Sequence, residues 1–338
     1  MLARGGWTDP SLLILVINHE TLRGRGAKLR NYLIKRCLAL IPLLLAVSFL
    51  SFALIAMVPA DPAEVALRVN EIVPTPEAVE ALRAELGLNK PFLIRYGDWL
   101  WKALHLDFGK SYINDRLVLD EILRCLPATL ELAAAALVLV VAVSLPVGIL
   151  GALFANRAFD RILRVLVFIG TAMPGYWVGL LLIWFFSIKL NLLPTSGSGS
   201  FSHLILPAVA LSLTYISTYV RLIRSNMLEN MRENYVLYGR VRGLSEKRIL
   251  LAHVLKNSLQ TSITAIGMSI PQLLAGTVII ENIFAWPGIG RLCISAIFNR
   301  DYPVIQLYIL LMAVLFILCN LIVDIIHHSL DPRLREGR

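Results

Sequence analysis

The feature that most constrains this chain is a series of uncharged apolar runs, each long enough to cross a lipid bilayer. The hydrocarbon core of a bilayer is about 30 Å thick, which a helix of about 20 apolar residues spans. Such runs form helices because lipid offers no partner for exposed backbone polar groups. Apolar residues make up 57% of the chain and charged residues only 16%. We therefore expect an all-α integral membrane protein.

The apolar runs predict six membrane spans. They lie at about 37–58, 132–154, 165–188, 204–224, 257–280 and 302–326. The fourth is short, and its extension to residue 224 depends on Arg221 and Arg224 reaching the interface by snorkelling. Five spans contain a proline in their interior, which frees a backbone carbonyl and favours a kink. These prolines are Pro42, Pro146, Pro174, Pro207 and Pro271.

The distribution of Lys and Arg predicts how the chain is oriented. Basic residues gather before the first span, between spans two and three, after span four and in the tail. The positive-inside bias then places both termini in the cytoplasm, together with a loop at 225–256. Residues 1–30 form a cytoplasmic extension of the permease-like region at 31–338. The apolar run Ser11 to Ile17 in that extension is too short to span.

A long polar segment at 59–127 is the one sizeable region predicted outside the membrane. It combines an amphipathic pattern after Pro74 and Pro76 with an aromatic group that includes Tyr96 and Trp99. We interpret it as a small helical lobe on the outer face that could contact a delivery protein. The alternative is that its aromatic side chains pack its own small core or sit at the interface.

Residues 231–258 form a basic segment interrupted by glycine between two apolar runs. Arg240 falls in the last turn of one expected helix, Gly243 can adopt the left-handed C′ conformation, and Ser245 can open the next helix. This helix, hinge and helix would make a rigid cytoplasmic element on which another protein could push, because force passes through packed elements. An ordinary basic inner loop is the alternative.

Catalytic and cofactor motifs are absent from the sequence. Gly109-Lys110-Ser111 resembles the end of a phosphate-binding loop, but Leu104 stands where the motif requires another glycine. His19-Glu20 begins a zincin-like pattern, yet Arg23 occupies the position of the second His. The four cysteines are scattered without a close pair. We therefore predict no enzyme activity, no cofactor, no resident metal and no nucleic-acid partner.

Polar and sulfur-containing residues in or beside the spans are candidates for a translocation pathway. They are Glu131, Met173, Met268, Glu281 and Asn320. Acids inside membranes often mark a pathway, but these lie near span ends, where water is expected to reach them. Methionine is more often a gap filler than a metal ligand. A structural or interfacial role is the alternative for each residue.

Several motifs give the chain a resemblance to a known family. The sharpest are WLWKALHLDFG at 99–109, LPATLEL at 126–132, ILPAVAL at 205–211, ENIFAWPGIGR at 281–291, IFNRDYPVIQ at 297–306 and CNLIVD at 319–324. The chain resembles a membrane permease subunit of the binding-protein-dependent ABC importers, in the branch that serves peptides and nickel. The first and fifth motifs are most similar to those of nickel permeases, whereas the WPGIGR and RDYP pieces are shared with peptide permeases.

The resemblance implies the fold of a type I ABC importer permease with six transmembrane helices and a small periplasmic lobe. It implies that an ATPase subunit receives the loop at 225–256. The residues assigned to this coupling loop are Glu233, Tyr235, Arg240, Gly243, Leu244 and Ser245. The chain departs from the family pattern at Gly239 and Val241, where alanine is usual, and at Gln260-Thr261, where Leu-Pro is common.

The expected function is that of a permease in the bacterial inner membrane that translocates nickel as a chelate. The implied partners are a second, similar permease, two cytoplasmic ATPase subunits and a periplasmic or lipid-anchored substrate-binding protein. Import of dipeptides or oligopeptides is the alternative, and the sequence does not decide whether nickel travels free or chelated. Two other classes are a secondary transporter, which needs buried charges mid-membrane, and a membrane-anchored enzyme or scaffold acting through residues 59–127.

Overall fold

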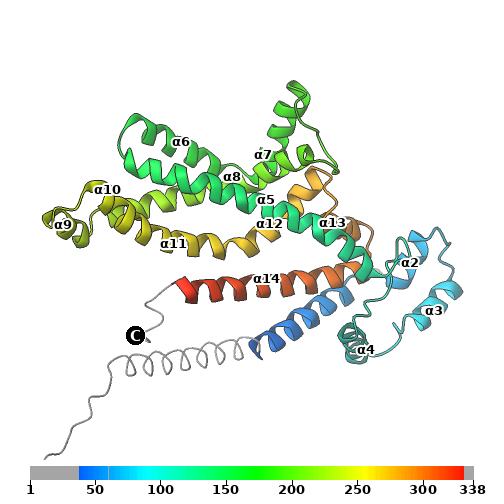
Figure 1. Cartoon of the computed structure of the whole chain (residues 1–338). Helices are drawn as coiled ribbons and strands as arrows, with labels where there is room; N and C mark the ends of the chain where they lie inside the picture. The colour runs from blue at the N-terminus through cyan, green and yellow to red at the C-terminus, as the bar shows by residue number, and fades with distance from the viewer. Residues whose placement is uncertain (1–37, 60, 331–338) are drawn as a thin grey trace, which may run out of the picture.

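The computed structural model describes residues 38–59 and 61–330, which are almost entirely helical (Figure 1). The extension at 1–30 lies outside the described residues. The elements of the first half are helix Leu38–Ala56, α2 (Pro62–Val69), α3 (Pro76–Glu85), α4 (Phe92–Leu104), α5 (Val118–Leu153), α6 (Ala158–Ala172), α7 (Gly175–Leu182) and η1 (Ile183–Lys189). Those of the second half are α8 (Phe201–Asn230), α9 (Asn234–Val241), α10 (Glu246–Ile249), η2 (Leu250–Val254), α11 (Leu255–Met268), α12 (Ile270–Ile283), α13 (Ile289–Phe298) and α14 (Tyr302–Leu330).

Four of the described helices are long and apolar enough to cross a membrane without a break. They are Leu38–Ala56, α5, α8 and α14. Two bent helix pairs are apolar enough to be either a broken span or a re-entrant loop, one joining α6 to the α7–η1 segment at 105° and one joining Glu246–Met268 to α12 at 47°. Counting each bent pair as one span gives up to six. The expected all-α membrane fold is confirmed.

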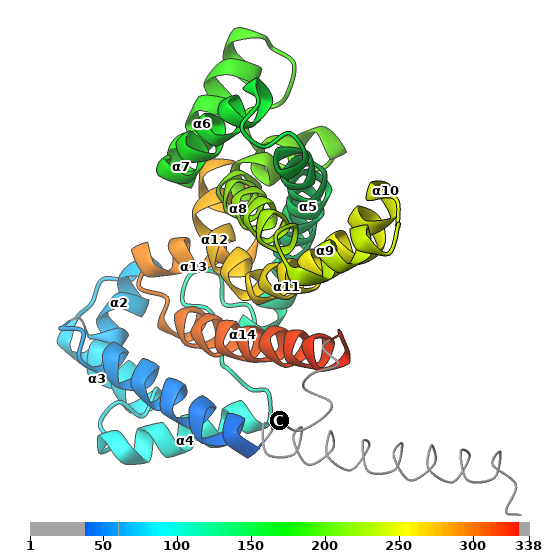
Figure 2. The ribbon, with the colours of Figure 1, turned by 90° about the vertical axis from the view of Figure 1, so that its left-hand side faces the viewer.

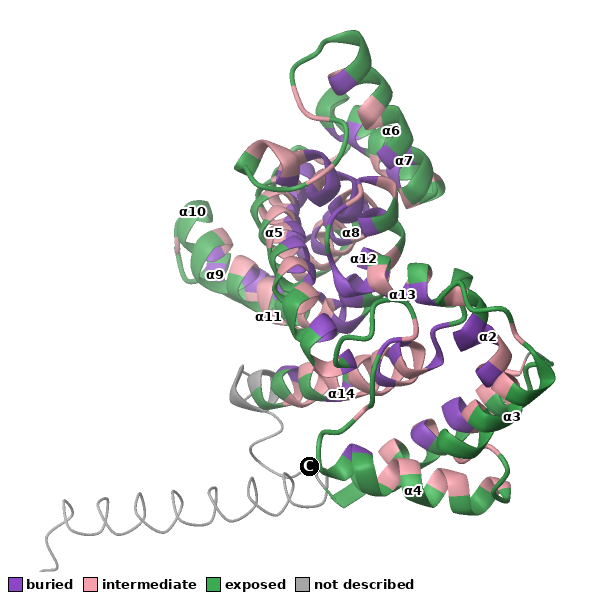
Figure 3. Cartoon of the chain, turned by 90° about the vertical axis from the view of Figure 1, so that its right-hand side faces the viewer, coloured by how far each residue is buried: buried purple, intermediate pink, exposed green. Residues whose placement is uncertain are grey.

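The long helices lie lengthwise beside one another, which separates two ends of the molecule (Figure 1). We call the end with α9 and α10 the loop end, and the end with α2–α4 and α13 the lobe end. Helices α5 and α8 pack along their length, and their facing residues Val140 and Ile223 are both fully buried. Gly148 permits this close approach, because a Cβ there would lie 2.8 Å from the Ile223 side chain. Figure 3 shows the buried residues concentrated around α5, α8 and α12.

Several helix boundaries differ from the expected ones. Helix α5 begins at Val118 and not at 132, so its first turns come from the segment expected to be part of the outer lobe. Pro127 lies inside α5 and does not end it. Helix α8 continues to Asn230, so the loop expected from 225 starts six residues later, nearly two helical turns. Both helices continue beyond their apolar sections. Hydropathy detects only the apolar sections, so it could not predict where the helices begin and end.

Two of the five span prolines coincide with breaks. Met173 is extended (φ −82°, ψ 129°) and Pro174 precedes α7, consistent with the bias of a residue before proline against helical geometry. Pro271 lies in the first turn of α12, where a missing N–H costs no helical hydrogen bond. The other three prolines lie inside continuous helices. They are Pro42, Pro146 and Pro207.

Candidate functional site

The coupling loop predicted from sequence adopts a defined helix–turn–helix geometry. Gly243 has a φ of +75°. This is a left-handed backbone conformation that is strained for a residue with a side chain. The Gly243 N–H donates to the Arg240 carbonyl at 2.9 Å, and the Leu244 N–H donates to the Gly239 carbonyl at 3.1 Å. These two bonds form a Schellman motif, which satisfies carbonyls at the end of α9. Helix α10 then begins after Ser245, whose side chain makes no capping hydrogen bond.

The loop is packed against the ends of the long helices. Val236 of α9 and Ile249 of α10 are buried in one cluster with Ala152 of α5, Met227 of α8 and Val254 of η2. Gly239 lets α9 approach α10, because a Cβ there would lie 3.2 Å from the Ile249 side chain. The alanine that is usual in the family pattern would therefore fit here only if the Ile249 side chain moved slightly. Helices α9 and α10 thus share one apolar cluster with α5, α8 and η2, which belong to three candidate spans.

The opposite side of α9 carries apolar residues on its surface. Leu237, Tyr238 and Val241 are 59%, 69% and 79% exposed. A groove of about 490 Å³ adjoins them where α8 meets α9, lined by Ser225, Leu228, Glu229, Arg232, Glu233 and Asn234. Large apolar side chains that stay exposed on a short helix are typical of an interaction surface.

Polar contacts within the loop are mostly on its surface. Arg240 Nε lies 2.7 Å from Glu246 Oε1, with both side chains more than half exposed. The hydrogen bond from Arg240 lowers the pKa of the Glu246 carboxyl. Tyr235 donates its hydroxyl to Asn230 Oδ1 at 2.9 Å, which ties α9 to the end of α8. The coupling residues predicted from the sequence thus lie together at the loop end, and their role stays a prediction.

Glu281, at the lobe end, is fully buried. Thr129 Oγ1 donates to its Oε1 at 2.7 Å, and the Gly290 and Arg291 N–H groups donate to its Oε2 at 2.8 and 3.1 Å. The carboxylate therefore caps the first turn of α13, where a helix end favours negative charge. The expectation that water reaches this acid was wrong, because the α12–α13 turn folds back over it.

The residues around Glu281 make the turn compact. A Cβ on Gly288 would lie 2.3 Å from the Glu281 carboxyl carbon, and a Cβ on Gly290 would lie 2.6 Å from the Val278 Cα. Both positions therefore exclude side chains. Trp286 Nε1 donates to the Ala128 carbonyl at 2.8 Å, and the Ile289 N–H donates to Thr129 Oγ1 at 2.9 Å, so two further bonds join this region to α5. Glu281 thus fastens α12, α13 and α5 together.

The sequence prediction included Glu281 but missed Thr129 and Trp286. The glycines of the ENIFAWPGIGR motif do signal a close backbone approach in the sequence. Nothing in the sequence pairs Thr129 with Glu281, however, because the two are 152 positions apart.

The other four pathway candidates have different surroundings. Glu131 on α5 is exposed, Met173 is half-buried after α6, Met268 at the end of α11 is 62% exposed, and Asn320 on α14 is half-buried. Among the residues that the structure describes, no hydrogen bond links any two of the five candidates. Within the same residues, no group of three or more His, Cys, Asp and Glu side chains could hold a metal ion. Their pathway role stays a prediction.

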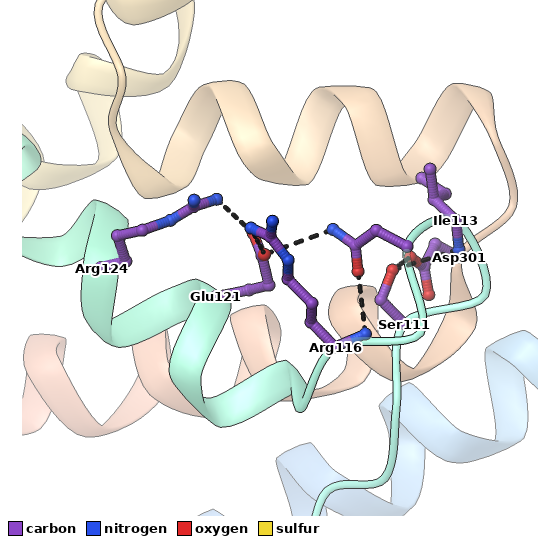
Figure 4. Close-up of polar contacts among 7 residues, drawn as sticks. Ser111, Ile113, Arg116, Glu121, Arg124 and Asp301 are labelled. Carbon is purple, nitrogen blue, oxygen red and sulfur yellow. Dashed lines mark hydrogen bonds and ion pairs between the residues drawn. The ribbon is translucent and has the colours of Figure 1, made fainter.

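A second polar cluster attaches the lobe to the spans (Figure 4). Ser111 Oγ donates to Asp301 Oδ2 at 2.5 Å, and the Tyr112 N–H donates to its Oδ1 at 3.2 Å. Asp301 precedes α14 and is 1% exposed, and this burial raises the pKa of its carboxyl. Glu121, 4% exposed, accepts bonds from Arg116 and Arg124 at 3.2 and 2.7 Å. These contacts connect the 109–117 segment to α5 and α14.

Comparison with protein families gives two matches that together cover nearly the whole chain. Residues 144–336 match the inner membrane component of binding-protein-dependent transport systems. Residues 29–133 match the N-terminal region of the corresponding membrane component.

Individual proteins give the same result. The metal-staphylopine import system permease CntB of Staphylococcus aureus is 40% identical over 308 residues, covering 91% of this chain and 99% of its own. The dipeptide transport system permease DppB of Escherichia coli is 35% identical, also covering 91% and 99%. The structure of the MetNI methionine ABC transporter matches with a TM-score of 0.54 at 18% identity, covering 62% of this chain and 96% of its own. That last similarity concerns the fold.

Proposed function

This chain belongs to the inner membrane component family of binding-protein-dependent transport systems, and from that premise we propose that it imports nickel as a chelate. It is a multi-pass ABC importer permease, a transporter component in the inner membrane. We propose that the loop end is cytoplasmic, with both termini, and that a second permease completes the pathway. Two ATPase subunits would drive it and a binding protein would deliver the cargo at the lobe end.

The packed coupling loop is the observation that supports the proposed coupling to ATPase subunits. Its buried face joins α5, α8 and η2 through Ala152, Met227 and Val254, while Leu237 and Val241 stay exposed on the other side. An ATPase subunit that binds the exposed side would therefore act on several spans at once. Figure 2, viewed toward the loop end, shows α9 and α10 projecting beside α11 and apart from α14.

Transport in this proposal proceeds by alternating access. ATP binding would close the ATPase subunits and shift α9 and α10, and hydrolysis would reset them. Nucleotide must bind one conformation more tightly than the other, by about 5.5 kcal/mol to move a population from 1:99 to 99:1. A floppy loop would absorb this displacement, whereas the Schellman turn at Gly243 and its apolar cluster would pass it on.

The cargo proposal comes from the relatives and from sequence motifs. CntB is a permease of metal-staphylopine import, which supports a metal carried with a small organic partner. The motifs at 99–109 and 297–306 favour nickel. DppB, a dipeptide permease, is similar over the same share of this chain, which keeps dipeptide import as the second candidate.

Uptake of radioactive nickel tests the cargo. Cells lacking this gene would be compared with restored cells, with nickel supplied either as the free ion or as a preformed chelate. We expect uptake of the nickel chelate to be lost in cells lacking the gene and recovered in restored cells, and uptake of the free ion to be the same in both. Dipeptide uptake is measured in parallel with the same strains.

The outcomes separate the cargo from the transport mechanism. Loss of dipeptide uptake with unchanged nickel uptake would assign the protein to peptide import and leave the coupling proposal intact. Rescue of free-ion uptake in medium without a chelator would contradict transport as a chelate. If uptake of free nickel, of the nickel chelate and of dipeptide were all unchanged by loss of the gene, both candidate cargoes would be contradicted.

A further inference from the structure

A groove between α6 and α8 combines apolar walls with an arginine cluster. Its volume is about 520 Å³, and its lining residues are Leu163, Arg164, Val167, Phe168, Thr171, Ala172, Val220, Arg221 and Arg224. Helix α6 lies on the opposite side of α8 from α14 in both ribbon views (Figures 1 and 2). All the lining residues of the groove come from α6 and α8.

The charges in the groove do not balance. Asp160 is fully buried and is bound by Arg224, whose Nε and Nη2 lie 2.6 and 2.9 Å from its two oxygens. Arg164 Nε lies farther from the same carboxylate, at 3.6 Å, and its side chain is 53% exposed. Arg221 is exposed and has no ion pair among the residues that the structure describes. The groove is thus lined by three guanidinium groups, and the two that lie near Asp160 share this one carboxylate, which leaves an excess of two positive charges.

The polar and apolar parts of the groove are separated along the helices. Helix α6 starts at the loop end, so Arg164 comes before Val167, Phe168 and Ala172 along its axis. At a rise of about 1.5 Å per residue, Ala172 lies about 12 Å beyond Arg164. Helix α8 runs the other way and brings Arg221 and Arg224 to the same end as Arg164. The result is a basic mouth at the loop end and an apolar channel leading away from it.

We propose that this groove binds an anionic phospholipid. Its phosphate would contact Arg164 and Arg221, and one acyl chain would lie along Val167, Phe168 and Ala172. Basic pockets between spanning helices are suited to anionic headgroups, because the bilayer supplies both the charge and the apolar chain. Arginine suits phosphate because its guanidinium can donate two parallel hydrogen bonds. The charge excess favours this occupant over another apolar protein helix.

The test measures lipid retention by the full chain purified in detergent. Phosphatidylglycerol and zwitterionic phosphatidylethanolamine are titrated separately and counted by native mass spectrometry. Arg221→Gln removes the unpaired guanidinium and should weaken phosphatidylglycerol binding about fivefold, the value of one basic contact near a lipid surface. Phosphatidylethanolamine binding should be unchanged. Arg224 is left intact, because its loss would leave the buried Asp160 unpaired.

Arg157→Gln is the matched control. It removes one positive charge at the start of the same helix, where Arg157 stacks over the Phe154 ring at 5.6 Å and does not line the groove. Ala172→Trp fills the apolar channel without changing charge, and it should also reduce phosphatidylglycerol retention. Inorganic phosphate should not compete, since it lacks the acyl chain.

Three results would overturn the proposal. One is an equal effect of Arg157→Gln and Arg221→Gln, which would indicate general surface attraction. Another is full competition by inorganic phosphate. The third is phosphatidylglycerol binding by Arg221→Gln that matches the unsubstituted chain. None of these readouts depends on the cargo or on ATPase coupling, so the proposed function can fail without affecting this result.

Discussion

The α12–α13 turn at the lobe end and the α9–α10 loop at the loop end are held in place by different forces. At the lobe end, the buried Glu281 carboxylate accepts bonds from Thr129 and from two backbone N–H groups of α13. At the loop end, apolar contacts around Met227 and Ile249 hold α9 and α10, whose own ion pair, Arg240–Glu246, is exposed, and the buried Asp160–Arg224 pair joins α6 to α8 rather than to this loop. A buried polar group without its partner is costly, whereas an exposed ion pair contributes little.

This difference suggests a division of labour between the ends. A buried hydrogen-bonded network permits one geometry, because any shift leaves donors unsatisfied. Apolar packing around a glycine turn tolerates small displacements while keeping its elements in contact. We therefore expect the lobe end to fix the fold and the loop end to respond to a partner.

The largest expected effect comes from Glu281→Ala. It leaves the Thr129 hydroxyl and the Gly290 N–H buried without an acceptor, which costs about 2–6 kcal/mol at about 1–3 kcal/mol each. Thermal unfolding of the purified protein should show a large fall in Tm. Glu281→Gln keeps an acceptor and most of the side-chain volume, so it should retain more stability. If the alanine variant were as stable as the natural chain, the buried hydrogen bonds of Glu281 would not be what holds the lobe end in place.

Gly243→Pro should have the next largest effect, on transport. Proline cannot adopt a φ of +75° and lacks the N–H that bonds Arg240, which together cost about 3 kcal/mol locally. Uptake should be abolished while the protein still inserts in the membrane at normal abundance.

Gly87→Pro is the matched control for that experiment. Gly87 ends α3 in the lobe with a φ of +67° and the same two hydrogen bonds, from Gly87 to Ala84 and from Leu88 to Arg83. Its substitution should disturb the lobe equally and preserve most of the uptake. Loss of uptake from both variants to the same extent would argue against a special role for the loop.

Asp301→Asn should change how stability depends on pH. Burial raises the pKa of this carboxyl, so the folded state binds more protons than the unfolded state between the two pKa values. The contribution of Asp301 is therefore complete at low pH and falls as pH rises through the folded pKa. Asparagine has a similar shape and keeps one acceptor oxygen, but it does not titrate. Subtracting the Tm of the variant from that of the natural chain should give a difference that declines with pH.

The smallest effect is expected from Arg240→Gln. The Arg240–Glu246 pair is exposed, so solvent screens it and Tm should stay within error. The pKa of Glu246 is lowered by this pair, so any contribution would be present at neutral pH and vanish as the carboxyl is protonated. Reduced uptake without a change in Tm would indicate that Arg240 contacts a partner.

The sequence by itself determined the membrane class, the helical fold and the turn at Gly243. Each depends on local chemistry. An uncharged run in lipid must satisfy its own backbone, and a left-handed C′ position selects glycine. The motif pieces also identified the transporter family, because they are contiguous in the chain. Pro174 and Pro271 stand at two helix breaks, but Pro42, Pro146 and Pro207 lie in continuous helices, so the prolines alone did not locate the breaks.

Only the tertiary structure decided which residues face one another. Thr129 and Glu281, Ser111 and Asp301, and Asp160 and Arg224 are between 64 and 190 positions apart. Their pairing follows from how α5, α6, α8, α12 and α14 pack, which hydropathy does not specify. The same packing turned Glu281 from an expected interfacial acid into a buried cap. Burial is a property of the assembled helices, because neighbours distant in sequence must close around a group to exclude water from it.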